Sequence, residues 1–98
     1  MIVVRFKMRC KPEKTEQAMA IFREIVAASR ALDGVISFDM GRDLSDPDSF
    51  IAIEVFEDQA AVERQESLAV VKEILEHVEE IVATPPEENI FHVSSTEP

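Results

Sequence analysis

The sequence predicts an α+β fold, in which two helices cover one face of a four-stranded antiparallel sheet. Four stretches alternate apolar and polar residues with the two-residue period of a strand, and two stretches repeat apolar residues at the three-and-four spacing of a helix. The order along the chain is strand, helix, strand, strand, helix, strand. This β-α-β-β-α-β order is typical of the ferredoxin-like arrangement, with both helices on one side of the sheet.

The first strand is expected at residues 2–10, where every second residue is apolar. Because successive side chains of a strand point to opposite faces, one face of this strand is wholly apolar. That face takes Ile2, Val4, Phe6, Met8 and Cys10, and the other takes Val3, Arg5, Lys7 and Arg9.

A first helix should begin at Pro12, which the first turn of a helix tolerates. Glu13 and Glu16 place negative charge at the positive end of the helix dipole. We expect the helix to run for about 20 residues, until Asp33-Gly34 ends it. A single apolar stripe should pack on the sheet through Ala18, Ile21, Phe22, Ile25, Ala28, Ser29 and Leu32.

The next two strands should form a hairpin around a turn at Asp46-Pro47-Asp48-Ser49. The strand before the turn alternates from Val35 to Leu44, and the strand after it alternates from Phe50 to Phe56. On the helix-covered face of the sheet we expect Val4, Phe6, Met8, Phe38, Ile51 and Ile53. On the opposite face we expect Arg5, Lys7, Arg9, Asp39, Glu54, Phe50 and Phe56.

The second half of the chain predicts a broken helix and a last strand. Asp58 is a suitable N-cap for a short helix at residues 59–64, and a second apolar stripe covers residues 68–83. Pro85-Pro86 ends the helix, so that a strand at residues 89–95 can follow. Residues 1–95 are thus expected to form a single domain, and residues 96–98 a C-terminal tail.

Composition limits the classes of function. With 98 residues and 46% hydrophobic content, the chain is long enough for one globular domain and shows no apolar run of the about 20 residues that a membrane span needs. No secretory signal is evident, so a cytoplasmic location is expected. The single cysteine, Cys10, excludes an internal disulfide and a cysteine-based metal cluster.

The charge is unevenly distributed. Residues 1–49 carry eight acidic and eight basic side chains, so the whole net charge of −10 belongs to residues 50–98. A negative field of this size repels nucleic acid and anionic lipid, and we therefore expect neither as a partner.

The face of the sheet that the helices leave open mixes charged and aromatic residues. Arg5 and Lys7 would lie beside Glu54, with Phe50 and Phe56 between them. Such a face fits an interface better than a solvent-exposed surface, and one interpretation is a homodimer whose two sheets stack and close a barrel. The other is a solvated face of mixed charge.

The chain resembles the antibiotic biosynthesis monooxygenase domain family. The similarity rests on the Gly34-Val35 step into a strand, the hairpin around residues 46–50, and the run Glu54-Val-Phe-Glu-Asp-Gln-Ala-Ala61 that leads into a helix. It implies a dimeric α/β barrel with a pocket between helices and sheet in each subunit. Members include quinol monooxygenases that use O₂ without metal or flavin, haem-degrading enzymes, and binding or isomerase-like proteins, so the fold alone does not choose the activity.

Two departures from the family pattern bear on chemistry. Members commonly carry a histidine where this chain has Gln65, and a carboxamide can orient a substrate oxygen but cannot accept its proton. At the places where haem-degrading relatives carry Asn, Trp and His, this chain has Phe6, Gln65 and Leu75. Haem degradation is therefore not expected.

The remaining residues that could act chemically are Glu54 and His92, which we predict as the catalytic acid or base groups. For each residue a structural role is the alternative: Glu54 could pair with Arg5 at an interface, and His92 could lie in the sheet stack. Gln65, Phe6, Phe22 and Phe38 are predicted to bind substrate, although the three phenylalanines could equally fill the core. Neither a metal nor a cofactor is expected.

The predicted function is a cofactor-independent monooxygenase that acts on a quinol or a related aromatic small molecule. The alternative is a non-catalytic dimeric protein that binds an apolar or aromatic small molecule and has lost the proton acceptor of the family.

Overall fold

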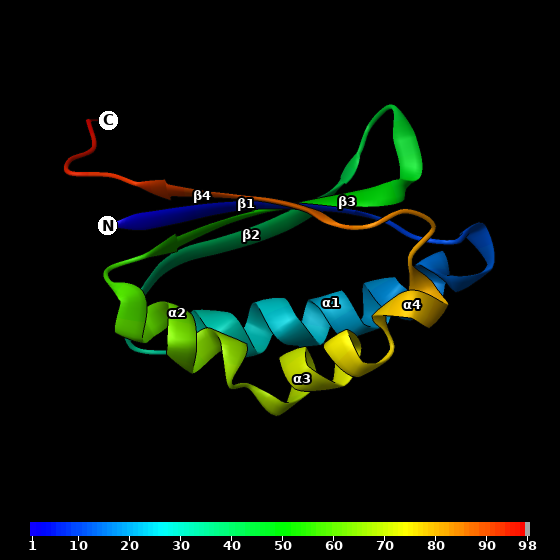
Figure 1. Cartoon of the computed structure of the whole chain (residues 1–98), viewed down its shortest axis with the longest axis horizontal. Helices are drawn as coiled ribbons and strands as arrows, with labels where there is room; N and C mark the ends of the chain where they lie inside the picture. The colour runs from blue at the N-terminus through cyan, green and yellow to red at the C-terminus, as the bar shows by residue number, and fades with distance from the viewer. Residues whose placement is uncertain (98) are drawn as a thin grey trace.

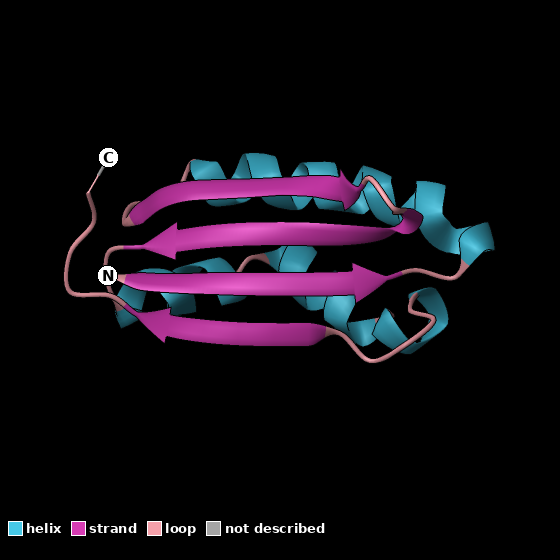
Figure 2. Ribbon diagram, turned by 90° about the horizontal axis from the view of Figure 1, so that it is seen from above, coloured by secondary structure: helices cyan, strands magenta, loops and turns pink. Residues whose placement is uncertain are grey.

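The computed structural model describes residues 1–97 and confirms the predicted α+β, ferredoxin-like fold. One antiparallel sheet contains four strands in the order β2-β3-β1-β4, and the helices cover one of its faces (Figures 1 and 2). The strands are β1 (Ile2–Arg9), β2 (Val35–Asp43), β3 (Asp46–Phe56) and β4 (Glu87–His92). The helical segments are η1 (Pro12–Lys14), α1 (Thr15–Arg30), α2 (Gln59–Glu66), α3 (Ala69–Glu76) and α4 (Val78–Ile81).

The core lies between α1 and the helix-covered face of the sheet, which we call the inner face. Phe22 and Ile25 of α1 are buried, as their places in the apolar stripe predict. The ring of Phe22 meets that of Phe50 edge to face, with 5.0 Å between the ring centres, a favourable arrangement for two aromatic rings. The inner residues of β1 and β2 complete this layer with Ile2, Val4, Met8 and Phe38.

The prediction for the two faces of β3 is wrong. β1 pairs Phe6 with Ala52 and Met8 with Phe50, and directly paired residues lie on the same face of a sheet. The inner face therefore takes Phe50, Ala52, Glu54 and Phe56, whereas Ile51 and Ile53 lie on the open face. Both faces of this strand carry large apolar side chains, so the two-residue period alone could not distinguish them.

The hairpin turn is also displaced from its predicted position. It lies at Leu44-Ser45, where the Asp43 carboxylate accepts hydrogen bonds from the backbone N–H and the hydroxyl of Ser45. The predicted turn residues, 46–49, instead begin β3. Short polar side chains that hydrogen-bond the nearby backbone can stabilise either a turn or the start of a strand. Here Asp43 stabilises the turn, and Asp46 stabilises the start of β3.

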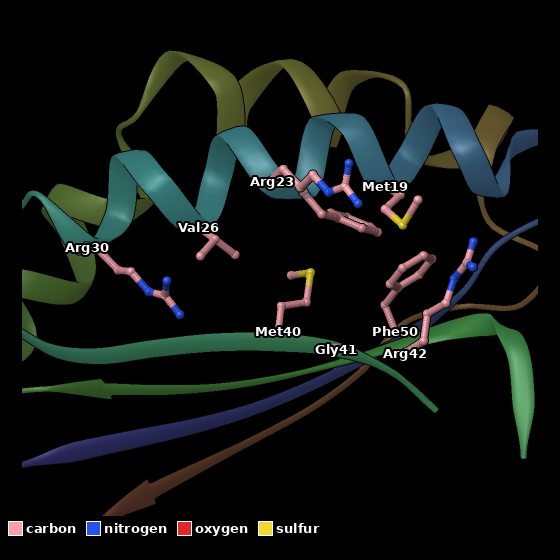
Figure 3. Close-up of a pocket in the computed structure, with 9 residues that line it drawn as sticks. Met19, Arg23, Val26, Arg30, Met40, Gly41, Arg42 and Phe50 are labelled. Carbon is pink, nitrogen blue, oxygen red and sulfur yellow. The ribbon is translucent and has the colours of Figure 1, made fainter. Parts of the chain in front are cut away.

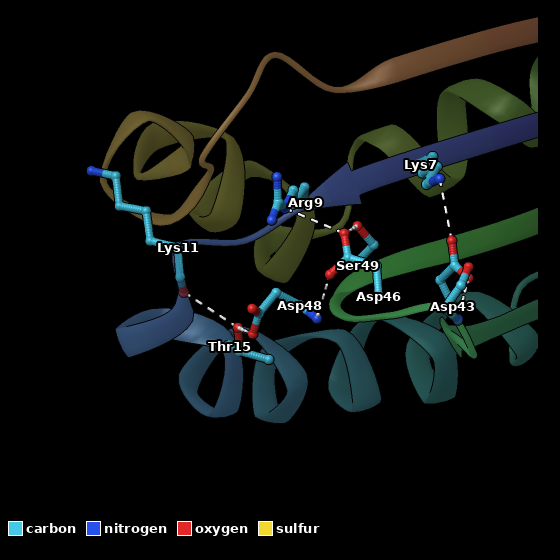
Figure 4. A network of polar contacts seen from close by, with 9 residues as sticks. Lys7, Arg9, Lys11, Thr15, Asp43, Asp46, Asp48 and Ser49 are labelled. Atoms are coloured by element: carbon cyan, nitrogen blue, oxygen red, sulfur yellow. Dashed lines mark hydrogen bonds and ion pairs between the residues drawn. The ribbon is translucent and has the colours of Figure 1, made fainter.

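A polar network ties the start of β3 to β1 and to α1 (Figure 4). The Asp46 carboxylate accepts hydrogen bonds from Ser49 and from the N–H of Asp48, and lies 3.2 Å from Arg9. These contacts, the Ser49 hydroxyl first, lower the pKa of Asp46. Thr15 donates to Asp48 at 2.8 Å and so joins α1 to the same strand.

Gly34 ends the loop between α1 and β2 in the left-handed region, with φ of +84°. A Cβ at this position would lie 2.7 Å from the Cβ of Ala61 and 2.8 Å from the guanidinium of Arg64. α1 ends at Arg30, before the predicted stop at Asp33-Gly34. Glycine is required at position 34 for two reasons, the left-handed backbone and the close approach of α2.

The helices after β3 differ from the prediction in one respect. Asp58 caps α2 as expected, because its carboxylate accepts from the N–H of Ala61 at 2.9 Å. The predicted helix over residues 68–83 is interrupted at His77, which lies 3.6 Å from Glu80. Ile74 and Ile81 are buried in this segment, whereas Leu75 is 60% exposed.

The chain ends with β4, which starts two residues before the predicted strand and ends three residues before its expected end, so that residues 93–97 have no regular secondary structure. Of the tail predicted at residues 96–98, residue 98 lies outside the described residues. No helix within residues 1–97 is long and apolar enough to cross a membrane.

The open face of the sheet carries charged and apolar side chains. The alternative in which Glu54 pairs with Arg5 is wrong, since Arg5 lies opposite Ile53 and contacts Glu87 at 3.7 Å. Lys7 contacts Asp43 at 3.3 Å on the same face. Ile53 and Phe91 are 41% and 52% exposed.

Candidate functional site

A cavity of about 460 Å³ lies between the inner face of the sheet and the helices. All four strands and helices α1, α2, α3 and α4 contribute residues to it. Its volume is within the range of small-molecule sites. The walls are mainly apolar and include Phe6, Phe22, Ile25, Phe38, Ile74 and Val78.

Five of the six residues predicted to act or bind line this one cavity. Phe6 of β1 and Phe38 of β2 point inward by strand alternation, and Phe22 belongs to the apolar stripe of α1. Glu54 and Gln65 complete the set. Phe22 and Phe38 are only 4% and 2% exposed, so the alternatives of core and cavity wall are both true of these rings.

Glu54 is the residue through which β3 lines the cavity. Its neighbours across the sheet are Val4 of β1 and Phe38 of β2, both apolar. Burial, with smaller contributions from the negative charges of Glu88 and Glu66, raises the pKa of Glu54 from 4.5 to about 7. A carboxylic acid with this pKa can accept and return a proton near neutral pH.

Charged residues line the cavity beside Glu54, and sequence reasoning missed them. They are Glu66 of α2, Lys72 of α3 and Glu88 of β4, all exposed at the rim. The register of β4 could have indicated Glu88, since it pairs with Phe6 and therefore lies on the inner face. Glu66 and Lys72 carry no comparable signal, because the break between α2 and α3 sets their directions.

Gln65 is buried, with 6% of its surface exposed, and connects two helices across the cavity. Its side-chain N–H donates to the Ser29 hydroxyl of α1 at 3.3 Å. A carboxamide has two N–H donors and an oxygen with two lone pairs, so this bond occupies part of its capacity. Gln65 can therefore orient a hydroxyl-bearing molecule in the cavity, as the sequence suggests, but it supplies no proton acceptor.

His92 lies apart from this cavity. It pairs with Ile2 at the end of β4 and lines a separate shallow cleft together with Met1, Glu57 and Asp58. The structure thus does not bring the two predicted catalytic residues together. Within residues 1–97, no three His, Cys, Asp or Glu side chains converge in a way that could hold a metal ion. The buried Cys10 thiol is also outside the cavity.

Comparison with known proteins supports the fold and the family. The model of the family described as "Antibiotic biosynthesis monooxygenase" matches residues 1–77. The Synechocystis sp. protein sll1783, which is uncharacterised, is 28% identical over 96 residues, which are 98% of this chain and 65% of that protein. The chain thus spans slightly less than two thirds of that relative.

A second relative carries a functional name. YcnE of Bacillus subtilis, provisionally named a monooxygenase, is 26% identical over 85 residues, which are 87% of this chain and 90% of YcnE. Among solved structures, Rv0793 of Mycobacterium tuberculosis superposes with a TM-score of 0.89 at 14% identity, covering 99% of this chain and 98% of its own. This likeness shows the shared fold.

Proposed function

Because the chain belongs to the antibiotic biosynthesis monooxygenase family, we propose that it oxidises a hydroquinone-type aromatic molecule with O₂ in the cavity that Glu54 lines. The single observation that supports this proposal most is the carboxyl group of Glu54, which faces a cavity walled by phenylalanines and has a pKa raised to about 7. Glu54 takes the place, as proton acceptor, of the histidine that relatives carry at the position of Gln65.

The proposed reaction begins when ionised Glu54 accepts the phenolic proton of the bound hydroquinone. The resulting anion is electron-rich and can reduce O₂ directly. One oxygen atom then forms a C–O bond to the ring, the other leaves as water, and the hydroquinone is oxidised to a hydroxyquinone. Gln65, held by Ser29, orients a ring oxygen, and the apolar walls exclude water from the anion.

The test is O₂ uptake with menadiol, a naphthalene hydroquinone, measured above the rate without protein. Glu54→Gln should lower the protein-dependent rate by at least about 100-fold, the usual contribution of a general base. His92→Gln should leave it unchanged, because His92 lies in another cleft. The rate should rise with pH through about 7, as the Glu54 carboxyl ionises.

The outcome also distinguishes the alternative of a binding protein without catalysis. Menadione, the oxidised analogue, would then bind saturably while menadiol consumed O₂ only at the spontaneous rate. The bond between Gln65 and Ser29 is the observation that favours this alternative, since it uses part of the carboxamide for structure. Absence of both uptake and binding would reject both functions.

We further propose that two copies associate through the open face of the sheet. The support is the exposure of Ile53 and Phe91 on that face of an 11.0 kDa chain, which is small for a self-sufficient core. Sedimentation velocity should give a species of twice that mass, and Ile53→Glu should convert it to monomer. Leu44→Glu, at the exposed hairpin turn, is the matched control. A monomeric wild-type protein would contradict the proposal.

A further inference from the structure

A second cavity, which we call the arginine groove, lies between α1 and the edge strand β2 (Figure 3). Its volume is about 330 Å³, at the lower end of the range for small-molecule sites. The α1 residues that line it recur at spacings of three and four, which places them on a single helix face: Met19, Phe22, Arg23, Val26 and Arg30. β2 contributes Met40 and Arg42, two residues apart and therefore on its inner face.

The charge of the groove is opposite to that of the protein. Three of the six arginines in a chain of net charge −10 line it, and no acidic residue does. Arg30 donates to the carbonyl of Phe38 at 2.9 Å and to Asp39 at 3.0 Å, while Arg42 contacts Glu16 at 2.8 Å. Since a guanidinium has five N–H donors, both keep donors beyond these contacts.

Arg23 differs from the other two arginines. Within residues 1–97, Arg23 makes no ion pair and no side-chain hydrogen bond. It lies on the same face of α1 as Arg30. Its guanidinium is therefore available to an anion without the loss of an existing contact.

The rest of the groove is apolar. Figure 3 shows Met19, Val26 and Met40 directed into the space between α1 and β2, with the Phe50 ring beside the Arg42 side chain. The Arg42 guanidinium lies 5.5 Å from the centre of that ring, a distance typical of a cation–π interaction. A ligand that matches this lining needs an apolar body and one negative group.

From these observations we propose that the arginine groove binds a small organic carboxylate with a flat apolar body, such as an aromatic monocarboxylate. Its carboxylate would accept charge-assisted hydrogen bonds from the arginines, and its body would displace water from the methionine and valine side chains. This site is independent of the oxidation proposed above.

The two cavities should sort ligands by charge. Phe22 and Met40 line both and so form the wall between them. The Glu54 cavity also carries Glu66 and Glu88, which disfavour an anion there. A carboxylate is therefore expected in the groove, and an uncharged aromatic molecule in the cavity beside Glu54.

Four methionines make this expectation measurable. Met19 lines only the groove, Met8 only the Glu54 cavity, Met1 only the cleft of His92, and Met40 lines both of the larger cavities. In protein labelled with ¹³C at the methionine methyls, 2-naphthoate should shift the Met19 and Met40 signals and leave Met8 and Met1 in place. The neutral isostere 2-naphthalenemethanol should bind the groove at least about tenfold more weakly.

Charge variants complete the test. Arg23→Gln should weaken 2-naphthoate binding at least about tenfold, the usual effect of one lost charge-assisted hydrogen bond, and Arg23→Lys should restore part of it. Lys72→Gln removes the same charge from the rim of the other cavity and should change the affinity less than about twofold. Because Arg23 is exposed, its variants should fold.

Several results would overturn the proposal. These are equal affinity for acid and alcohol, shifts at Met8 instead of Met19, an unchanged affinity in Arg23→Gln, or no saturable binding at millimolar concentration. A Met19 shift that depends on protein concentration without any ligand would assign the groove to a second copy of the chain and would also refute the carboxylate site.

Discussion

The ionisation of Glu54 should make the stability of this protein depend on pH in a way that one substitution removes. The pKa of Glu54 in the folded protein is about 7, above its ordinary value of 4.5. Between these values the folded chain holds a proton that the unfolded chain releases, so the free energy of unfolding falls as pH rises through this window. Below about pH 4.5 and above about pH 7, the contribution of Glu54 is constant.

Glu54→Gln keeps the size of the side chain and abolishes its titration. At about 1.36 kcal/mol per pH unit, the window from 4.5 to about 7 corresponds to at most about 3.4 kcal/mol. Glu54 is only partly buried, and solvent at the cavity rim screens its charge, so we expect about 2 kcal/mol. The variant should therefore gain about 2 kcal/mol relative to wild type between about pH 4 and about pH 8.

The assay is urea unfolding of wild type and variant at both pH values, at one protein concentration because association would add to stability. The chain contains neither Trp nor Tyr, so helix circular dichroism is the suitable signal. Glu57→Gln, which removes an exposed carboxylate from the same segment, should show no such pH-dependent gain.

One further variant separates the two causes of the raised pKa. Glu88→Gln should move the pH window of wild type downward, because Glu88 is the larger of the two charges that raise the pKa of Glu54 after burial itself. A difference between Glu54→Gln and wild type that is the same at both pH values, or that is larger at the acidic one, would refute the reasoning about Glu54.

Three further predictions concern the scaffold. Gly34→Ala should lower the free energy of unfolding in urea by about 2–3 kcal/mol, because it combines a strained φ with a collision against Ala61. The control is Gly41→Ala, whose new Cβ has no atom within 4 Å. It should change the same free energy by less than about 0.5 kcal/mol. Asp58→Ala should cost about 1 kcal/mol by removing the cap of α2, and an unchanged urea midpoint would contradict the role of that cap. Burial raises the pKa of the Cys10 thiol to about 11. At about pH 8 a disulfide reagent should therefore react with Cys10 at least about 100-fold faster in denaturant than in the folded protein. Equal rates would show that the thiol is exposed in the folded protein.

Strand and helix periods were sufficient to predict the order of elements, but not the faces of β3. The sequence predicts the inner positions of Phe6, Met8 and Phe38 correctly, because bulky apolar side chains alternate with polar ones around them. In β3, Phe50 and Phe56 compete with Ile51 and Val55 for the core, and both sets are apolar. Pairing with β1 decides the outcome, and pairing is a long-range property that a local pattern does not contain.

The same property explains how much of the candidate site could be predicted. Strand and helix periods alone predict the inward positions of Phe6, Phe22 and Phe38, so the fold brings these three rings to one cavity. The sequence predicts a catalytic role for Glu54 but places it on the open face, beside Arg5. In the structure Glu54 lies on the inner face, and its neighbours across the sheet are apolar. Burial on that face is the main cause of its raised pKa.

The carboxylates beside Glu54 have two opposing effects on the proposed reaction. Glu66 and Glu88 raise the pKa of Glu54 and so make the ionised carboxylate a stronger base, but they also reduce the fraction that is ionised at neutral pH. Proton transfer from a hydroquinone would move the negative charge from a crowded carboxylate to a ring enclosed by apolar walls. Like-charge repulsion at Glu54 decreases in that step, so the acidic rim favours deprotonation of an uncharged substrate and disfavours entry of a charged one. The arginine groove, on the other side of Phe22 and Met40, has the opposite preference.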